Sequence, residues 1–456
     1  MHLIENFKQS KYYNLDTLLN VLVVLNIVFL VKVAYYLTFL HHLPPPFYYD
    51  ANNTFFDFFE ISRMSFMPGL YENVSPNYLP FVFGLGRLFS PLSCDLVNPY
   101  NYRLCALPSI LWMFCFYVIG TFSLGYYLSR AHTIQNSTFN ITQLGLIVFT
   151  SPMLLYAFER GNYVILTLLL LLMYEFTKAI WVRIILAILM INLKIYMIIL
   201  LLPMFLKGYY KKILIILFGV IVSNVLISHY FNYAFHWHNF IFNLFHFEAP
   251  IHIAGHAPIG YLTEHLWTNV SMENLLKVTS QSNLDTACQY VGQISCNILT
   301  LLSHLHLDAL WKLSVAVFSG ATIVMMAWLY RLNKLPSLLT EEMMLFYLIL
   351  SLMMFVSHIG AYVLILMIPY VFLLPRYSLG VILSFIILFT TLTDIPFYPS
   401  SVKEYFSFIG QTYFTATHTI QLSSYLRPLA LTYLFYFYTK LIFNAYLSVP
   451  KRLRPL

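Results

Sequence analysis

The stretch AFERGNYVILTLLLLL, residues 157–172, places a glutamate, an arginine, a glycine and an asparagine directly before a run of leucines. A second strongly apolar run precedes this polar cluster. Two apolar runs joined by a short polar segment are typical of two membrane helices that meet at a turn, and Gly161 permits that turn to be tight. The stretch therefore predicts a membrane helix on either side of Gly161.

The composition of the whole chain agrees with this local pattern. Of the 456 residues, 60% are hydrophobic and 9% are charged, whereas soluble domains average roughly 45–50% and roughly 25%. We therefore predict an all-α polytopic membrane protein. The net charge of +7 is weak evidence for an anionic ligand, because basic residues gather in the cytoplasmic loops of membrane proteins. The apolar run that begins near Leu15 is too long for a signal peptide and is predicted as the first transmembrane helix.

Cutting the chain at its polar, proline and glycine residues gives about twelve transmembrane helices, because a bilayer core needs roughly 20 apolar residues per helix. They are predicted over 16–40, 104–129, 142–157, 162–177, 183–194, 196–207, 213–232, 309–330, 342–357, 361–375, 378–394 and 424–446. The lysine and arginine bias places both termini in the cytoplasm. The helices on either side of Lys194 are too short to cross alone, and we predict a broken pair there.

This topology leaves two large extracytoplasmic loops, 41–103 and about 233–308, and a smaller one over 395–423, all within a single transmembrane domain, 1–456. Residues 77–90 are predicted to form a short helix at the membrane interface. Two cysteines of the second loop, Cys288 and Cys296, either form a disulfide or remain as two thiols. Cys105 and Cys115 are expected to be small core residues.

Charged residues inside apolar runs are candidates for function, because a charge costs roughly 2.5–3.5 kcal/mol at the centre of a membrane helix. Lys32, Lys312 and Lys440 lie near helix ends and can snorkel. Lys194 has no other charge nearby in the sequence; we expect it either to bind a ligand or to pair with Glu159. Arg160 offers a planar fork of donors that suits a phosphate.

Alternatives remain open for the rest of the polar residues. Glu159, Arg160 and Asn162 either serve a ligand or form a network that pins the turn. Asp57 lies among four phenylalanines, which would partly desolvate it and strengthen it as a base; the ordinary alternative is a helix-capping aspartate. No metal site is expected in the second loop, since its histidines lack the spacing of zinc ligands. They are His236, His238, His246, His252, His256 and His265.

Four stretches, in this order, resemble bacterial GT-C-type integral membrane glycosyltransferases, in the branch that contains polyprenyl-phosphate-mannose-dependent mannosyltransferases. The stretches are FFDFFEISRMSFMPGLYENVSPNYLPF (55–81), SPMLLYAFERGNYVILTLLLLL (151–172), AILMINLKIYMIILLLPMFLKGYYKK (187–212) and SHIGAYVLILMIPYVFLLP (357–375). The resemblance covers most of residues 15–395. It implies a GT-C-like fold whose active site is built from extracytoplasmic loops.

The resemblance also implies roles for individual residues. Asp57 matches the catalytic aspartate of the first loop, with Asp50 as the alternative. Tyr78 lies in a segment similar to the family's Gly-x-Tyr followed by Tyr-Pro-Pro, although Asn77-Tyr78-Leu79-Pro80 departs from the double proline. Arg160 and Lys194, with Tyr196 beside the lysine, lie where the family has its donor-facing cavity.

The implied reaction is an inverting transfer of a hexose from a polyprenyl-phosphate donor to a lipid-linked glycan or surface polysaccharide such as O-antigen. Asp57 accepts the proton of the acceptor hydroxyl, and Arg160 and Lys194 stabilise the departing phosphate. Two cations at the leaving group can replace a metal ion, so no cofactor is expected. The expected location is a bacterial inner membrane, without nucleic-acid partners. A flippase or transporter of lipid-linked sugars, or an O-antigen polymerase or ligase, are the alternatives.

Overall fold

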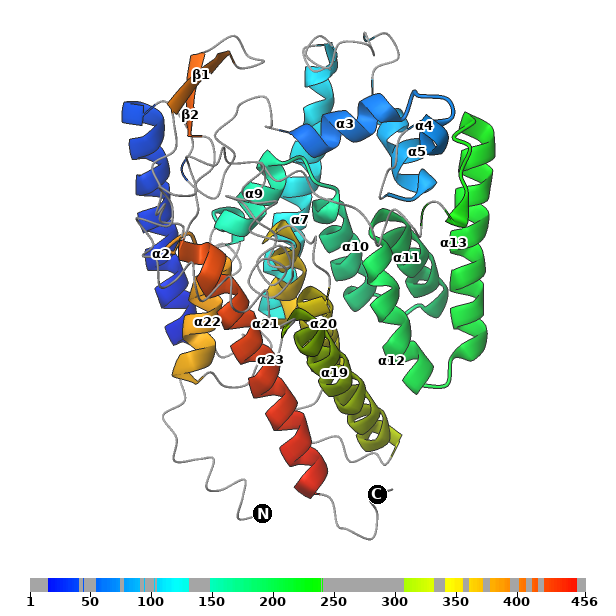
Figure 1. The fold of residues 1–456 in the computed structure, drawn as a ribbon, viewed down its shortest axis with the longest axis vertical. Helices are drawn as coiled ribbons and strands as arrows, with labels where there is room; N and C mark the ends of the chain where they lie inside the picture. Colours follow the sequence, from blue (N-terminus) through cyan, green and yellow to red (C-terminus); the bar gives the residue numbers. More distant parts are fainter. Residues whose placement is uncertain are drawn as a thin grey trace.

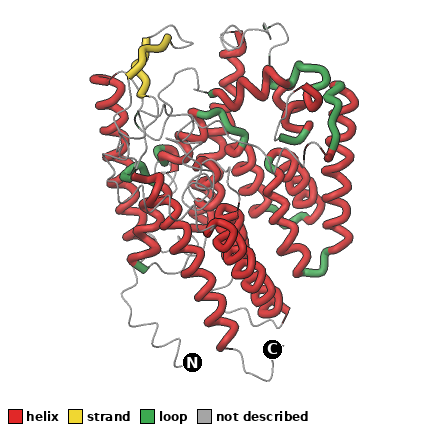
Figure 2. Tube along the Cα trace, in the orientation of Figure 1, coloured by secondary structure: helices red, strands yellow, loops and turns green. Residues whose placement is uncertain are grey.

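A computed structural model describes residues 15–40, 44, 55–73, 78–90, 94, 102, 105–130, 148–238, 240, 307–331, 341–355, 361–371, 378–393, 402–406, 412–416 and 422–448. Over these residues the chain is a bundle of helices accompanied by one short hairpin (Figures 1 and 2). Three short helices, α3, α4 and α5, lie together at one end of the bundle, beside α13 (Figure 1).

The helices follow the apolar runs of the sequence. The first half of the described chain forms α2 (Leu15–Tyr35), η2 (Tyr36–Leu40), α3 (Phe56–Met64), α4 (Leu70–Asn73), α5 (Pro80–Leu88), η4 (Leu107–Ser109), α7 (Ile110–Arg130), α9 (Pro152–Glu159), α10 (Val164–Phe176), α11 (Ile180–Leu193), η5 (Ile195–Leu200), α12 (Leu201–Leu206) and α13 (Tyr210–Phe231). The second half forms α19 (Leu307–Arg331), α20 (Glu341–Phe355), η7 (Ala361–Met367), α21 (Ile368–Val371), α22 (Leu379–Phe389), β1 (Val402–Phe406), β2 (Thr412–Ala416) and α23 (Leu422–Ser448). Every one of the twelve predicted ranges therefore contains helical structure.

Three of these helices are long and apolar enough to cross a membrane, among the residues that the structure describes. They span Leu18–Phe39, Leu107–Tyr127 and Tyr210–Phe231. Large apolar side chains project from their outer surfaces, including Ile27, Val31, Phe122, Leu214 and Phe218, each more than half exposed. Such an outward apolar face is unfavourable in water and favourable in lipid. The chain thus has membrane character, while twelve crossings stay a prediction.

Two predicted helices differ in form from the expectation. Within the range 361–375, the described residues 361–371 form a 3-10 helix, η7, followed by the short α21. Pro369 lies in the first turn of α21, where its missing N–H would have no partner within the helix in any case. In the range 378–394, α22 ends at Phe389, because the threonines that follow are poor helix formers.

Residues 395–423, predicted as a loop, contain an exception to the all-α prediction. Strands β1 and β2 pair in antiparallel register, with Val402 opposite Ala416 and Phe406 opposite Thr412. A two-stranded antiparallel hairpin needs only pairing between segments that are close in the sequence, here VKEYF and TYFTA. The chain is therefore mainly helical with one small hairpin.

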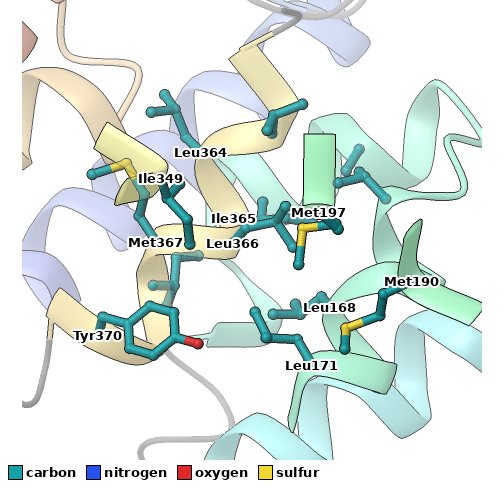
Figure 3. Packing of buried hydrophobic residues seen from close by; sticks show 14 of the residues in the cluster. Leu168, Leu171, Met190, Met197, Ile349, Leu364, Ile365, Leu366, Met367 and Tyr370 are labelled. Carbon is teal, nitrogen blue, oxygen red and sulfur yellow. The ribbon is translucent and has the colours of Figure 1, made fainter. Parts of the chain in front are cut away.

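The centre of the bundle is apolar and fully buried. Figure 3 shows its side chains, contributed by α10, α11, η5, α20, η7 and α21: Leu168, Leu171, Met190, Met197, Ile349, Leu364, Ile365, Leu366, Met367 and Tyr370. The 3-10 helix η5 contributes Met197 to this core and packs against α11 and α20. Buried contacts therefore hold the segment directly after Lys194. The helix break at Lys194 is therefore anchored to the centre of the protein.

The cysteine prediction was wrong for two residues. Cys105 forms a disulfide with Cys94, across a Cα–Cα distance of 5.6 Å, and Cys115 is exposed on α7. Cys105 is helical and lies two residues before η4, and its disulfide joins this helix start to Cys94 in the predicted first loop. Cys288 and Cys296 lie outside the described residues.

Candidate functional site

The candidate site begins where the first loop docks onto the turn between α9 and α10. The backbone N–H of Phe55 donates to the carbonyl of Glu159 at 2.6 Å, and that of Asp57 donates to the carbonyl of Arg160 at 3.1 Å. Gly161 has a φ of 63°, and an added Cβ would lie 2.7 Å from the Cβ of Phe58. Only glycine combines this left-handed backbone with so close an approach. The predicted tight turn is confirmed, and α3 packs directly on it.

The carboxylate of Asp57 is held by two side chains of that turn. Arg160 donates from Nη2 to Oδ1 at 2.6 Å, and Asn162 donates from Nδ2 to Oδ2 at 2.6 Å. The Oδ1 of Asn162 in turn accepts from the backbone N–H of Val164 at 3.0 Å, which fixes the orientation of the amide. Each carboxylate oxygen thus has one hydrogen bond and keeps capacity to accept another.

This geometry tests the helix-capping alternative for Asp57. The N-cap of α3 is Phe55, without a side-chain cap, and Asp57 lies in the first turn of the helix. The helix-capping alternative is therefore wrong. The carboxylate faces residues more than 100 positions away in the sequence, across the junction between the first loop and the bundle.

Lys194 reaches the same place from a different direction. Helix α11 ends at Leu193, and Lys194 is extended, with φ −143° and ψ 104°, before the 3-10 helix η5 begins. The predicted break is confirmed. The Nζ of Lys194 donates to the hydroxyl of Tyr78 at 3.2 Å and lies 4.6 Å from the centre of its ring. The carboxylate of Asp57 lies close enough to interact electrostatically with this ammonium group.

Tyr78 connects the cation to the first loop. Its carbonyl accepts a hydrogen bond from the hydroxyl of Tyr71, which lies on α4. Burial raises the pKa of Tyr78 well above its usual value, and the negative charge of Asp57 raises it further. The hydroxyl therefore stays protonated and can donate to an oxygen while it accepts from Lys194. Tyr196 is half-buried and also lies close enough to interact electrostatically with Tyr78.

The site is shielded from solvent but not sealed. Arg160 and Lys194 are 6% and 7% exposed, while the side chain of Asp57 is 15% exposed. Glu159 is buried as well. In such surroundings charges interact more strongly than in water, because little solvent lies between them. The arrangement can accept a proton at Asp57 and can stabilise negative charge near the two cations.

The structure thus brings together most of the residues that the sequence singled out. Asp57, Tyr78, Arg160, Asn162 and Lys194 form one cluster from three separate segments. Asp50 lies outside the described residues. The proposed pair of Lys194 with Glu159 stays a prediction. His236 and His238 are exposed, and the other four histidines of the second loop lie outside the described residues.

Sequence reasoning missed the polar residues that lie beneath this cluster. Asn192 and Asn224 are fully buried on α11 and α13, and the Nδ2 of Asn224 donates to the Oδ1 of Asn192 at 2.6 Å. The available signal was an asparagine inside each of two apolar runs, MINLK and VSNVL. Amides in membrane helices usually hydrogen-bond to another helix, but the partner helix cannot be identified from one sequence.

Comparison with protein-family models, with curated proteins and with solved structures finds no match to this chain.

Proposed function

We propose that this protein is a multi-pass membrane glycosyltransferase of the GT-C type that transfers a hexose from a polyprenyl-phosphate donor. The observation that carries the proposal is the meeting of Asp57, Arg160, Asn162, Lys194 and Tyr78 in one partly exposed cluster. A carboxylate beside two cations matches the two demands of the reaction, which are a proton acceptor and a site for a leaving phosphate.

Asp57, Arg160 and Lys194 have roles in the proposed step. The acceptor hydroxyl attacks the anomeric carbon of the donor and transfers its proton to the carboxylate of Asp57. The bond between that carbon and the phosphate oxygen breaks, and the lipid phosphate leaves with the electron pair. Lys194 and Arg160 stabilise the negative charge on the phosphate. The configuration at the anomeric carbon is inverted.

The first loop would have to face the compartment in which the lipid-linked acceptor is glycosylated. The Cys94–Cys105 disulfide supports an extracytoplasmic position of this loop, because disulfides persist in oxidising compartments. We place the chain in a bacterial inner membrane with both termini in the cytoplasm. The acceptor is a lipid-linked glycan or a surface polysaccharide, and the two cations replace a metal ion, so transfer should persist in EDTA.

The decisive experiment compares wild type, Asp57→Asn and Glu60→Gln in lipid nanodiscs. Each protein is given a panel of polyprenyl-phosphate hexoses and a lipid-linked glycan, and the transferred sugar is measured. Glu60 is the matched control, because it is a carboxylate on the same helix that pairs instead with Arg63. We expect Asp57→Asn to lose a factor of roughly 10²–10⁴ in turnover, the contribution of a general base, and Glu60→Gln to remain active.

Three results would contradict parts of the proposal. Equal transfer by wild type and Asp57→Asn would remove Asp57 as the base and make Asp50 the next candidate. A wild type that transfers nothing but moves lipid-linked sugar between leaflets would be a flippase. A product in which whole glycan units are joined would indicate a polymerase or a ligase.

A further inference from the structure

Behind the candidate site, α5, α11 and α13 are joined by a buried polar network, which we call the Asn192–Asn224 network and which consists of Asn192, Ser223 and Asn224. The Oδ1 of Asn224 accepts from the backbone N–H of Phe81 at 3.0 Å. Its Nδ2 donates to Asn192 and to the carbonyl of Val220, at 2.6 Å and 2.7 Å. Asn192 completes the network by donating to the hydroxyl of Ser223 at 2.9 Å.

The two ends of this network lie next to the two residues of the Lys194–Tyr78 contact. Asn192 is the penultimate residue of α11, two positions before Lys194. Phe81 is the second residue of α5, three positions after Tyr78, and its N–H is one of the donors at a helix start that has no partner within the helix. Asn224 therefore caps the helix that begins two residues after Tyr78 and, through Asn192, fixes the end of the helix that directly precedes Lys194.

We infer that Asn224 is a positioning residue that sets the distance between Lys194 and Tyr78. Its burial supports this assignment, since Asn224 is 0% exposed and Asn192 1% exposed. An amide inside a membrane helix is unfavourable unless it is bonded, and each bond of Asn224 outside its own helix leads to one side of the Lys194–Tyr78 contact. Without it, the N–H of Phe81 at the start of α5 loses its partner on α13, and the end of α11 keeps only the bond of Asn192 to Ser223.

The functional consequence rests on the proposed glycosyl transfer. Lys194 stabilises the leaving phosphate only if its ammonium group is held at the right place, and a displacement of about 1 Å can cost on the order of 100-fold in rate. We therefore expect Asn224→Leu to lower transfer by on the order of 100-fold. The loss should arise entirely through Lys194, so the same substitution should cost nothing further in a Lys194→Met background.

The matched control is Asn26→Leu. Asn26 is also a buried amide in a helix able to span a membrane, and it donates to the hydroxyl of Thr150 at 3.2 Å. It contacts neither α5 nor α11 through that bond. Both leucine variants lose hydrogen bonding between segments, two bonds in Asn224→Leu and the bond to Thr150 in Asn26→Leu, so both should unfold more easily. Asn26→Leu should nevertheless transfer within about twofold of wild type, because distant sites act independently.

A second readout does not depend on transfer. Lys194 is acylated with a water-soluble amine reagent in nanodiscs, and its labelling is followed by mass spectrometry. We expect several-fold faster labelling in Asn224→Leu than in wild type or Asn26→Leu, because a displaced ammonium group loses its contact with Tyr78. Ser223→Ala, which removes one bond of the network, provides a milder variant should Asn224→Leu fail to fold.

The outcomes separate this inference from the proposed function. The positioning role would be overturned if the losses of Asn224→Leu and Lys194→Met multiply in the double variant, or if Asn26→Leu loses as much transfer as Asn224→Leu. In either case, transfer by wild type would still uphold the proposed function. If wild type transfers nothing, the proposed function fails, and the labelling decides the inference by itself. Equal labelling of Lys194 in all folded variants would overturn it.

Discussion

Replacing Gly161 with alanine tests the geometry that joins the first loop to the bundle. An alanine Cβ at this position would lie 2.7 Å from the Cβ of Phe58 and 3.2 Å from the Cα of Phe55. Neither atom can rotate away, because the backbone of α3 and its two hydrogen bonds to the turn fix both. The substitution must therefore displace α3 or the turn.

The expected destabilisation follows from two contributions. An alanine in the left-handed region costs about 1–2 kcal/mol, and overpacking against fixed atoms costs about 1–3 kcal/mol. Together they predict a loss of about 2–5 kcal/mol in the free energy of unfolding. Because Arg160 and Asn162 flank this glycine and hold Asp57, transfer should fall as well, by on the order of 100-fold.

Gly120→Ala is the control for this substitution. Gly120 lies inside α7, and an added Cβ would meet only Ile165, at an ordinary contact distance of 3.9 Å. Alanine is preferred to glycine within a helix by roughly 0.5–1 kcal/mol, so this variant should be slightly more stable than wild type. Both variants are unfolded by titration with a denaturing detergent and assayed for transfer. If Gly161→Ala unfolds at the same detergent concentration as Gly120→Ala, this segment does not form a left-handed turn packed on α3.

Further predictions concern other contacts of the first loop. Cys105→Ser should lower the free energy of unfolding by about 2–3 kcal/mol, the value expected for removing a disulfide between residues 11 positions apart. A reducing agent should destabilise wild type but should not destabilise this variant further. Arg87 lies 4.8 Å from the centres of two phenylalanine rings, so Arg87→Met should cost about 1–2 kcal/mol in detergent unfolding, and Arg87→Lys less. Burial raises the pKa of Tyr78, so the folded protein keeps this proton where the unfolded chain releases it. The contribution of Tyr78 to the free energy of unfolding is therefore present below about pH 10 and is lost as the pH rises above it. Between about pH 9 and 11, the unfolding midpoint should fall less steeply with pH in Tyr78→Phe than in wild type.

The membrane character and the positions of most helices were determined by the sequence alone. Apolar runs end at proline, glycine and charged residues, and this punctuation is a local property that one sequence displays. The same reasoning found the break at Lys194 and the tight turn at Gly161. It also selected Arg160 and Lys194 as candidates, since a charge in an apolar run is unfavourable wherever the chain folds.

Only the tertiary structure decided which residues meet. Asp57 and Arg160 are 103 positions apart, and their contact depends on α3 docking onto the turn before α10. The partner of Cys105 and the bonds of Asn224 to α5 and α11 were equally hidden. The contacts of Asp57 and Asn224 share one physical reason: each joins elements through the packing of whole helices, and no periodicity or spacing within one segment encodes the segment that lies against it.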